Sequence, residues 1–257
     1  MATESINILD ASSRESTDFE RVHVMDGWVM KDQDPAPGWN PALQGPRHFI
    51  GDNPEDIDFG VLEMYLNFHL MGDGGTLLQD IESWPLNDGN LVRQSHSVMM
   101  HKVVCGAIKR IRPDIHLTCF SCPVPSGRAY NLRGWWNHKA ERWKRIVEAC
   151  ESVIWDLDSI TVPVYWYSKS PTIAIDYARR ALSLANQWRA KKPIRALICP
   201  RVVKPLYGNE RWQDNPQIED RHMRKFLASG VLPFADELMV WDSSSSEDWQ
   251  MGDWGLG

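Results

Sequence analysis

Residues 74–85 have the sequence Gly-Gly-Thr-Leu-Leu-Gln-Asp-Ile-Glu-Ser-Trp-Pro, and this segment decides the fold. A glycine pair, a short apolar run and a closing proline predict one buried strand that enters a loop. Residues two apart share a face of a strand, so Asp80 and Glu82 are expected to project side by side from its end. Two adjacent carboxylates repel each other, so one should keep its proton towards neutral pH. Such a pair is suited to general acid catalysis on a glycosidic oxygen, although Asp-x-Glu is also common in solvated loops.

The composition is that of a globular protein with many tryptophans. The chain has 257 residues, 43% apolar and 24% charged, which is enough for one well-buried domain. The net charge of −6 gives no sign of nucleic-acid binding. The 13 Trp residues outnumber both Phe and Tyr. Flat indole faces suit sugar rings and also suit an ordinary core, so most are expected to be structural and a few to line a groove.

Cysteine usage and the first residues of the chain bear on its cellular setting. The five cysteines are odd in number, and residues 1–20 are polar with no apolar signal segment, which predicts reduced thiols and a cytoplasmic protein as encoded. Release by another route is the alternative. Cys119-x-x-Cys122 supplies at most half of a zinc site, so neither a metal nor a cofactor is expected. No apolar run approaches the ~20 residues that span a bilayer, so no membrane contact is expected.

Apolar runs and helical spacing alternate along the chain. Eight runs are expected to form strands, beginning near residues 6, 22, 76, 115, 152, 162, 194 and 238. Helical patterns separate most of them, at residues 61–70, 91–111, 135–149, 173–190 and 217–229. Residues 31–57 are rich in Pro, Gly, Asp and Asn and are expected to form a long loop.

This alternation predicts an α/β fold with a parallel sheet, and specifically a (β/α)8 TIM-like barrel over residues 1–242, with irregular first units as a variant. Residues 243–257 are expected to be a flexible tail. A doubly wound sheet is the competing fold, but the first predicted strand is not followed by a glycine-rich loop. In a barrel the active site lies at the carboxyl ends of the strands, where Asp80, Glu82, Tyr165 and Trp241 would meet. Core packing is the competing role for both aromatic residues.

Four segments, in order, resemble the hyaluronidase family of glycoside hydrolases. Asp80-Ile81-Glu82-Ser83-Trp84-Pro85 is similar to that family's Asp-x-Glu-x-Trp-x-Pro acid motif, with the proline one place early. Ser121-Cys122-Pro123 through Ala129-Tyr130-Asn131 resembles its Pro-x-Cys-Tyr-Asn segment, with an insertion. Trp155 through Pro163-Val164-Tyr165 resembles its Trp-rich run, and residues 238–244 resemble its closing strand. The resemblance covers roughly residues 60–245; the chain is shorter than the family and lacks an evident set of disulfide cysteines.

The resemblance implies a retaining mechanism in which the substrate's own N-acetyl oxygen attacks the anomeric carbon. Glu82 would be the general acid and base, and Asp80 would orient the acetamido group. The implied substrate is a hyaluronan-like or chondroitin-like polysaccharide. The residues implied to contact it are Tyr130, Tyr165, Tyr167, Trp84 and Trp241.

Two alternatives stay open at this point. One is a catalytically inactive barrel that binds a glycan or a protein with the same rim. The other is a glycosidase with two enzyme carboxylates, using Asp156, Asp158 or Asp236 as the partner. A basic cluster on the helix predicted at 135–149 would face an anionic polymer or, more simply, solvent; its members are Lys139, Arg142, Lys144 and Arg145.

Overall fold

The structure is a computed structural model that describes residues 42–44, 56–69, 74–81, 84–86, 90–120, 122–124, 140–166, 170–188, 190–199 and 217–240. Within these residues it has an α/β fold made of two parallel sheets and the helices beside them. The first sheet has the order β1 (Ala42–Gln44), β2 (Thr76–Asp80) and β3 (His116–Cys119). The second has the order β4 (Ile160–Pro163), β5 (Ile194–Ile198) and β6 (Glu237–Val240).

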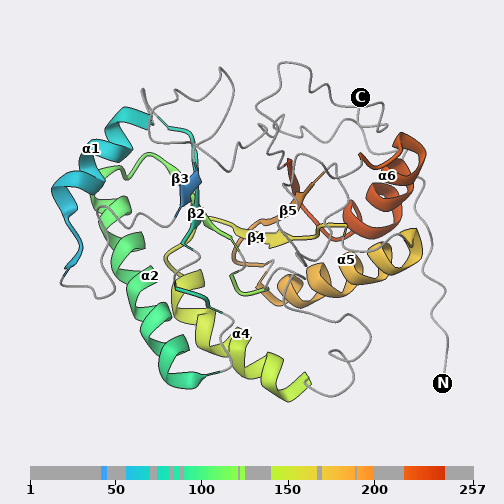
Figure 1. The fold of residues 1–257 in the computed structure, drawn as a ribbon, viewed down its shortest axis with the longest axis horizontal. Coiled ribbons are helices and arrows are strands. Elements are labelled where there is room, and N and C mark those ends of the chain that lie inside the picture. The colour runs from blue at the N-terminus through green and yellow to red at the C-terminus, as the bar shows by residue number, and fades with distance from the viewer. Residues whose placement is uncertain are drawn as a thin grey trace, which may run out of the picture.

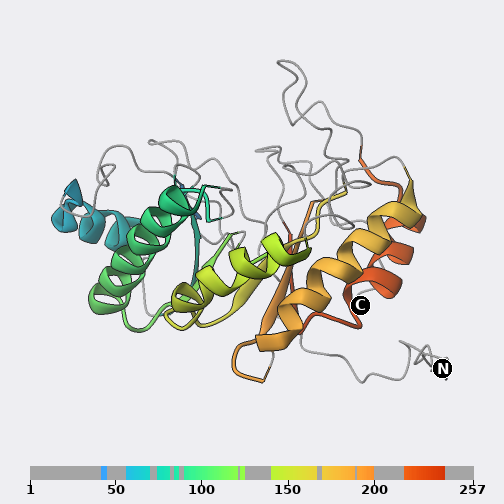
Figure 2. The ribbon, with the colours of Figure 1, turned by 90° about the horizontal axis from the view of Figure 1, so that it is seen from below.

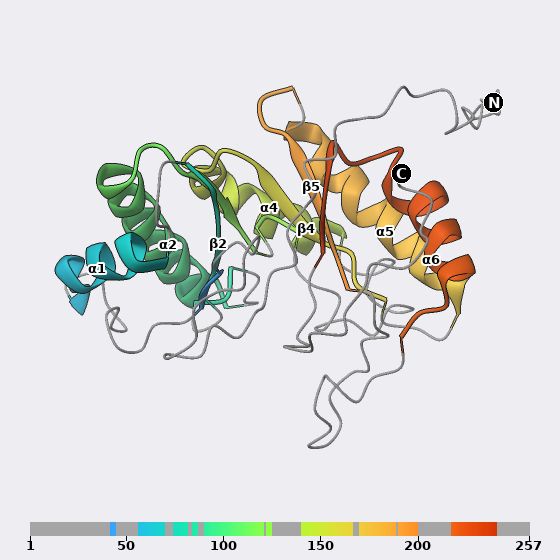
Figure 3. The ribbon, with the colours of Figure 1, turned by 90° about the horizontal axis from the view of Figure 1, so that it is seen from above.

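The helices follow one another along the outside of the strands. They are α1 (Phe59–His69), α2 (Leu91–Ile111), α4 (Ala140–Ile154), α5 (Pro171–Ala185) and α6 (Asp220–Phe226). A 3₁₀ turn (Asn186–Trp188) extends α5, and a π-helical turn (Leu227–Val231) extends α6. In Figure 1 these helices form an arc from α1 on the left, through α2 and α4 below, to α5 and α6 on the right. Figures 2 and 3 show the same succession from two sides.

Local sequence explains where β2 and α2 begin. Gly74 and Gly75 precede β2 with φ of 78° and 101°, a conformation that favours glycine. The N–H of Gly74 donates to Asp114 Oδ2 at 2.7 Å, which ties this turn to the end of α2. Asn90 caps α2, because its side-chain oxygen accepts from the N–H groups of Val92 and Arg93.

The two faces of each sheet differ in chemistry. Side chains on one face join the hydrophobic core that packs against the helices, among them Leu77, Leu117, Val162, Ala196 and Leu238. Alternation places a second set on the opposite face. This face is polar at the amino ends of the strands β2 to β6. The polar residues there are Thr76, His116, Ser159, Arg195 and Glu237.

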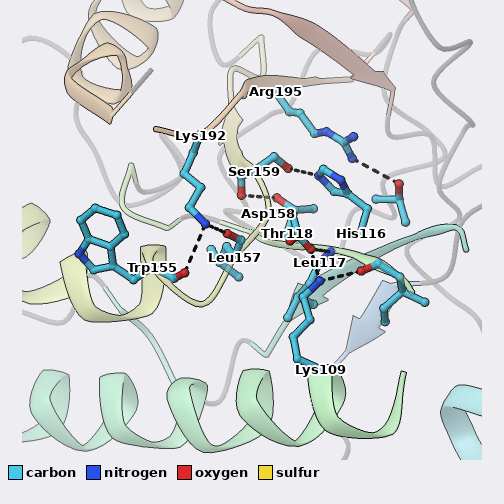
Figure 4. A network of polar contacts seen from close by, with 12 residues as sticks. Lys109, His116, Leu117, Thr118, Trp155, Leu157, Asp158, Ser159, Lys192 and Arg195 are labelled. Carbon is cyan, nitrogen blue, oxygen red and sulfur yellow. Dashed lines mark hydrogen bonds and ion pairs between the residues drawn. The ribbon is translucent and has the colours of Figure 1, made fainter. Parts of the chain in front are cut away.

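Side-chain hydrogen bonds join the two sheets through this polar face. Thr118 Oγ1 lies 2.6 Å from Thr161 Oγ1, which links β3 to β4. Arg195 forms an ion pair with Glu237, and its Nη1 lies 3.4 Å from Thr76 Oγ1 in the other sheet. Figure 4 shows the neighbouring hydrogen bonds of Ser159 with His116 and Thr118 from close by. The faces that carry no helices therefore look onto a shared interior.

Two expectations about the elements are wrong. Residues 152–156 do not form a strand: residues 152–154 are the last turn of α4, and Trp155 is 50% exposed. A short apolar run fits a buried helix as well as a strand, and here Val147, Cys150 and Ile154 continue one buried helical face. The loop expected at 31–57 contains β1. The strands expected near residues 6 and 22 lie outside the described residues.

An ion pair at the amino ends of β3 and β4 makes the stability of the fold depend on pH. Asp158 pairs with Lys109 and accepts from the N–H of Leu117 at 2.7 Å. Burial raises the pKa of Asp158, but Lys109 and the Leu117 amide outweigh it, so this pKa lies below its ordinary value. The stabilisation is therefore complete above about pH 5 and is lost as the pH falls through the folded-state pKa.

We expect Asp158→Asn to lower the free energy of unfolding by about 1–2 kcal/mol at pH 7, because the lost contacts are only partly screened by solvent. The difference from wild type should shrink at pH 3. Urea denaturation at both pH values measures it. Asp176→Asn is the matched control, since Asp176 forms an exposed pair with Arg180 one helical turn away, worth roughly 0.5 kcal/mol. A difference that stays constant between pH 7 and pH 3 would contradict the assignment.

Within the described residues, the structure contains no helix both long and apolar enough to cross a membrane. The same residues contain no cluster of three or more His, Cys, Asp or Glu side chains arranged to hold a metal ion. All five cysteines are buried, and none of them forms a disulfide.

Candidate functional site

Asp80 is the last residue of β2 and is 4% exposed. Alternation along β2 places it on the same face as Thr76 and Leu78, towards the shared interior, and away from Gln79. Its backbone pairs in register with Gln44 of β1. A carboxyl group buried at the carboxyl end of a parallel strand occupies the position where α/β enzymes carry catalytic groups.

Aromatic rings lie at the carboxyl ends of the next two strands. Tyr165 follows β4 by two residues and is 5% exposed. Its ring centroid lies 6.2 Å from that of Phe120, which follows β3 directly. The N–H of Phe120 donates to the carbonyl of Gln79 at 2.9 Å, so the end of β3 is fixed beside the residue before Asp80. Asp80, Phe120 and Tyr165 therefore belong to one end of the sheets.

Sequence analysis did not identify Phe120. The signal was available, because His116, Thr118 and Phe120 alternate along β3 and its continuation, so Phe120 shares the face of Thr118.

Trp84 directly follows residues 80–83, which we call the acid segment. It is 4% exposed and belongs to the core, and its ring meets that of His101 edge to face at a centroid distance of 6.0 Å. The N–H of Trp84 donates to the carbonyl of Ile81 at 3.1 Å, which ties Trp84 to the residue that follows β2. Trp84 therefore anchors the chain that leaves Asp80 to helix α2.

A buried polar cluster supports the same segment from α2. The side chain of Gln79 lies 2.7 Å from His101 Nδ1, and Cys105 Sγ lies 3.0 Å from Gln79 Oε1. His101 Nε2 lies 3.0 Å from the carbonyl oxygen of Trp84. The apolar pattern that predicts this helix does not include His101. Its spacing from Ser97, Val104 and other buried positions was the available signal.

Thiols adjoin this cluster. A hydrogen bond from Cys122 holds the pKa of Cys119 below its ordinary value although burial raises it, and His101 also lowers it. Cys119 Sγ lies 3.9 Å from His101 Nδ1. Burial lowers the pKa of His101, but Cys119, the Trp84 carbonyl and Asp80 together raise it above its usual value. The charge of Asp80 therefore contributes to the raised pKa of His101.

The alternative acids lie at the opposite end of the sheets. Asp158 bonds the N–H of Leu117, whose register partner in β2 is Leu77. That is three residues before Asp80, or about 10 Å along the strand. Asp236 directly precedes β6 and accepts from the N–H of Ile194 at 2.9 Å, at the start of β5. Asp156 lies in the turn before β4. The structure therefore places Asp158 and Asp236 at the end of the sheets that is opposite to Asp80.

Several predicted site residues cannot be placed. Glu82, Tyr130, Tyr167, Trp241 and Lys139 lie outside the described residues, as do the side chains of the other members of the basic cluster. Of the seven candidates, the structure places Asp80 and Tyr165 at one end of the sheets and Trp84 behind them.

Comparison with known proteins identifies the fold. A scan against protein-family models finds no match, and neither does a search of curated proteins. Among solved structures, bee venom hyaluronidase in complex with a hyaluronic acid tetramer matches with a TM-score of 0.59 and 13% identity, over 78% of this chain and 77% of that one. A monoclinic crystal form of bee venom hyaluronidase matches with a TM-score of 0.55 and 13% identity, over 75% and 72%. The chain therefore has an α/β fold similar to that of a glycoside hydrolase.

Proposed function

We propose that this protein is a glycoside hydrolase that cleaves an N-acetylhexosamine-containing polysaccharide. The observation that carries the proposal is Asp80, a carboxyl group buried at the carboxyl end of β2 in a hyaluronidase-like fold. Glu82, two residues further along, is the second acid of the proposed pair.

The proposed chemistry divides the work between the two acids. Glu82 donates its proton to the glycosidic oxygen as the bond to the anomeric carbon breaks, and the carbonyl oxygen of the substrate's acetamido group forms the new bond to that carbon. Asp80 orients the acetamido N–H and stabilises the positive charge that develops on it. Glu82, now ionised, then takes a proton from the water that opens this intermediate. Two inversions at one carbon give net retention.

Aromatic side chains would form the walls of the sugar subsite. Tyr165 beside Phe120 supports such a wall, since both rings lie at the Asp80 end of the sheets. Flat rings pack well against the C–H faces of sugars. Further proposed contacts to the sugar are Tyr130, Tyr167 and Trp241. Trp84 would support the acid segment from its buried side.

We also propose that the two sheets are parts of one (β/α)8-type domain over residues 1–242, followed by a tail at 243–257. The contact of Arg195 with Thr76 and the bond between Thr118 and Thr161 support this, because each joins the two sheets through the interior.

A panel of polysaccharides tests the activity. The purified protein is incubated with hyaluronan, chondroitin, chitin oligosaccharides and cellulose oligosaccharides, and new reducing ends are measured. We expect cleavage of at least one N-acetylated polymer and none of cellulose. Binding of an N-acetylated polymer without any cleavage would contradict the proposal and favour the inactive binding barrel.

A further inference from the structure

A continuous chain of buried hydrogen bonds connects helix α2 to the acid segment at two points. It runs from Cys105 to Gln79 at 3.0 Å, from Gln79 to His101 at 2.7 Å, and from His101 to the Trp84 carbonyl at 3.0 Å. Gln79 and Cys105 are fully buried, and His101 is 2% exposed. Gln79 directly precedes Asp80, and Trp84 follows the acid segment.

The donors in this chain assign its direction. Burial raises the pKa of the Cys105 thiol far above its ordinary value, so Cys105 keeps its proton and donates to Gln79 Oε1. This fixes the amide of Gln79 with its nitrogen towards His101 Nδ1. The proton of the neutral ring is then on Nε2, which donates to the Trp84 carbonyl. The cationic ring keeps that proton, so the contact with Trp84 exists in both charge states, whereas the bond from the Gln79 amide to Nδ1 requires the neutral ring.

We propose that His101 is a positioning residue for the acid pair: it holds Gln79 on one side and the Trp84 backbone on the other, and so fixes both ends of the chain that carries Asp80 and Glu82. The inference rests on the proposed function for its catalytic consequence. Its structural content, a clamp on residues 79–84, is independent of any activity.

The geometry accounts for why a histidine occupies this position. The ring nitrogens of His101 face Gln79 and the Trp84 carbonyl at the same time, and no aliphatic side chain would satisfy both buried groups. Among the described residues after β2, the N–H of Trp84 also donates to the carbonyl of Ile81. A displacement of about 1 Å at a catalytic group costs on the order of 10²-fold in rate, so loss of the clamp should appear in kcat.

Two substitutions separate the clamp from simple packing. The amide nitrogen of Gln reaches the position of ring Nε2, whereas that of Asn reaches only the position of Nδ1. His101→Gln and His101→Asn both remove the imidazole ring and its edge-to-face contact with the Trp84 ring. Only His101→Gln retains a donor for the Trp84 carbonyl. His96→Asn, at a half-buried position on the same helix, is the matched control.

Hydrogen exchange followed by mass spectrometry tests the clamp without a substrate. We expect the peptide covering residues 81–86 to exchange faster in His101→Asn than in wild type, and at the wild-type rate in His101→Gln and His96→Asn. Equal protection of this peptide in all four proteins would overturn the inference. If His101→Asn does not fold, nitrogen-15 NMR of the wild-type ring replaces it: a slowly exchanging proton on His101 Nε2 supports the clamp, and a neutral ring protonated on Nδ1 overturns it.

Kinetics on a cleaved polysaccharide from the panel tests the catalytic consequence. His101→Asn should lower kcat by about 10²-fold with KM within about twofold, and His101→Gln should restore most of that loss. Equal kcat in both variants would overturn the positioning role. If the wild type cleaves no polymer, the proposed function fails, while the exchange experiment still decides the clamp.

Discussion

Replacing Glu82 by Gln is expected to lower kcat by about 10²–10⁴-fold with little change in KM or in melting temperature. The amide has nearly the shape of the carboxyl group but neither donates a proton to the leaving oxygen nor accepts one from water. Substrate binding depends mainly on the sugar subsites, so KM should change little. Initial rates of reducing-end release from the best polymer of the panel measure the effect.

Asp80→Asn tests the second acid of the pair, and Glu63→Gln is the control. Asp80→Asn should lower kcat by roughly 10²–10³-fold, because the developing positive charge loses its counter-charge. Glu63 is exposed on α1, and Glu63→Gln should leave kcat and KM at their wild-type values. A Glu82→Gln protein that keeps kcat within threefold of wild type would contradict the assignment of the acid.

Arg195→Met should lower the free energy of unfolding by about 2–4 kcal/mol, the largest stability effect we expect. Arg195 is 5% exposed on the polar interior face and pairs with Glu237 of the neighbouring strand. Met fills much of the same volume, but the Glu237 carboxylate loses its partner in a site that is only partly open to water. Urea denaturation at pH 7 measures the loss.

The double variant Arg195→Met/Glu237→Gln isolates the pair. It should recover part of the loss, because no unpaired charge is then left between the sheets. Strict additivity of the two single substitutions would show that the ion pair makes no specific contribution, and the account of the polar interior would then be wrong.

Much of the element order follows from periodicity. The strand expected near residue 76 and the helix expected at 91–111 are confirmed as β2 and α2, because a glycine pair and an asparagine cap mark where they begin. The run at 152–156 fits a strand as well as a helix, because five residues are too few to distinguish the two periods. Only the continuation of the α4 face from Val147 to Ile154 decides it.

The candidate site was predictable only in part. Alternation predicts from sequence alone that Asp80 shares a strand face with Leu78, and the structure shows that this face is the inner one. Strand register, which a single sequence does not contain, shows that Asp158 and Asp236 lie at the far end of the sheets. The spacing of His101 from Val104 indicates that it is buried, but its role is recognised only when its partners, Gln79 and the Trp84 carbonyl, are known.

The most direct test of the central claim compares one polysaccharide with and without its N-acetyl groups. A partially N-deacetylated hyaluronan and its N-acetylated parent, matched in length, are incubated with the protein, and the cleavage positions are determined by mass spectrometry of the products. If Asp80 and Glu82 act through the substrate's acetamido oxygen, cuts will fall only at N-acetylated residues, and the rate will decrease in proportion to the acetyl groups removed. Cuts at deacetylated residues at an equal rate, or no cuts in either polymer, would contradict it.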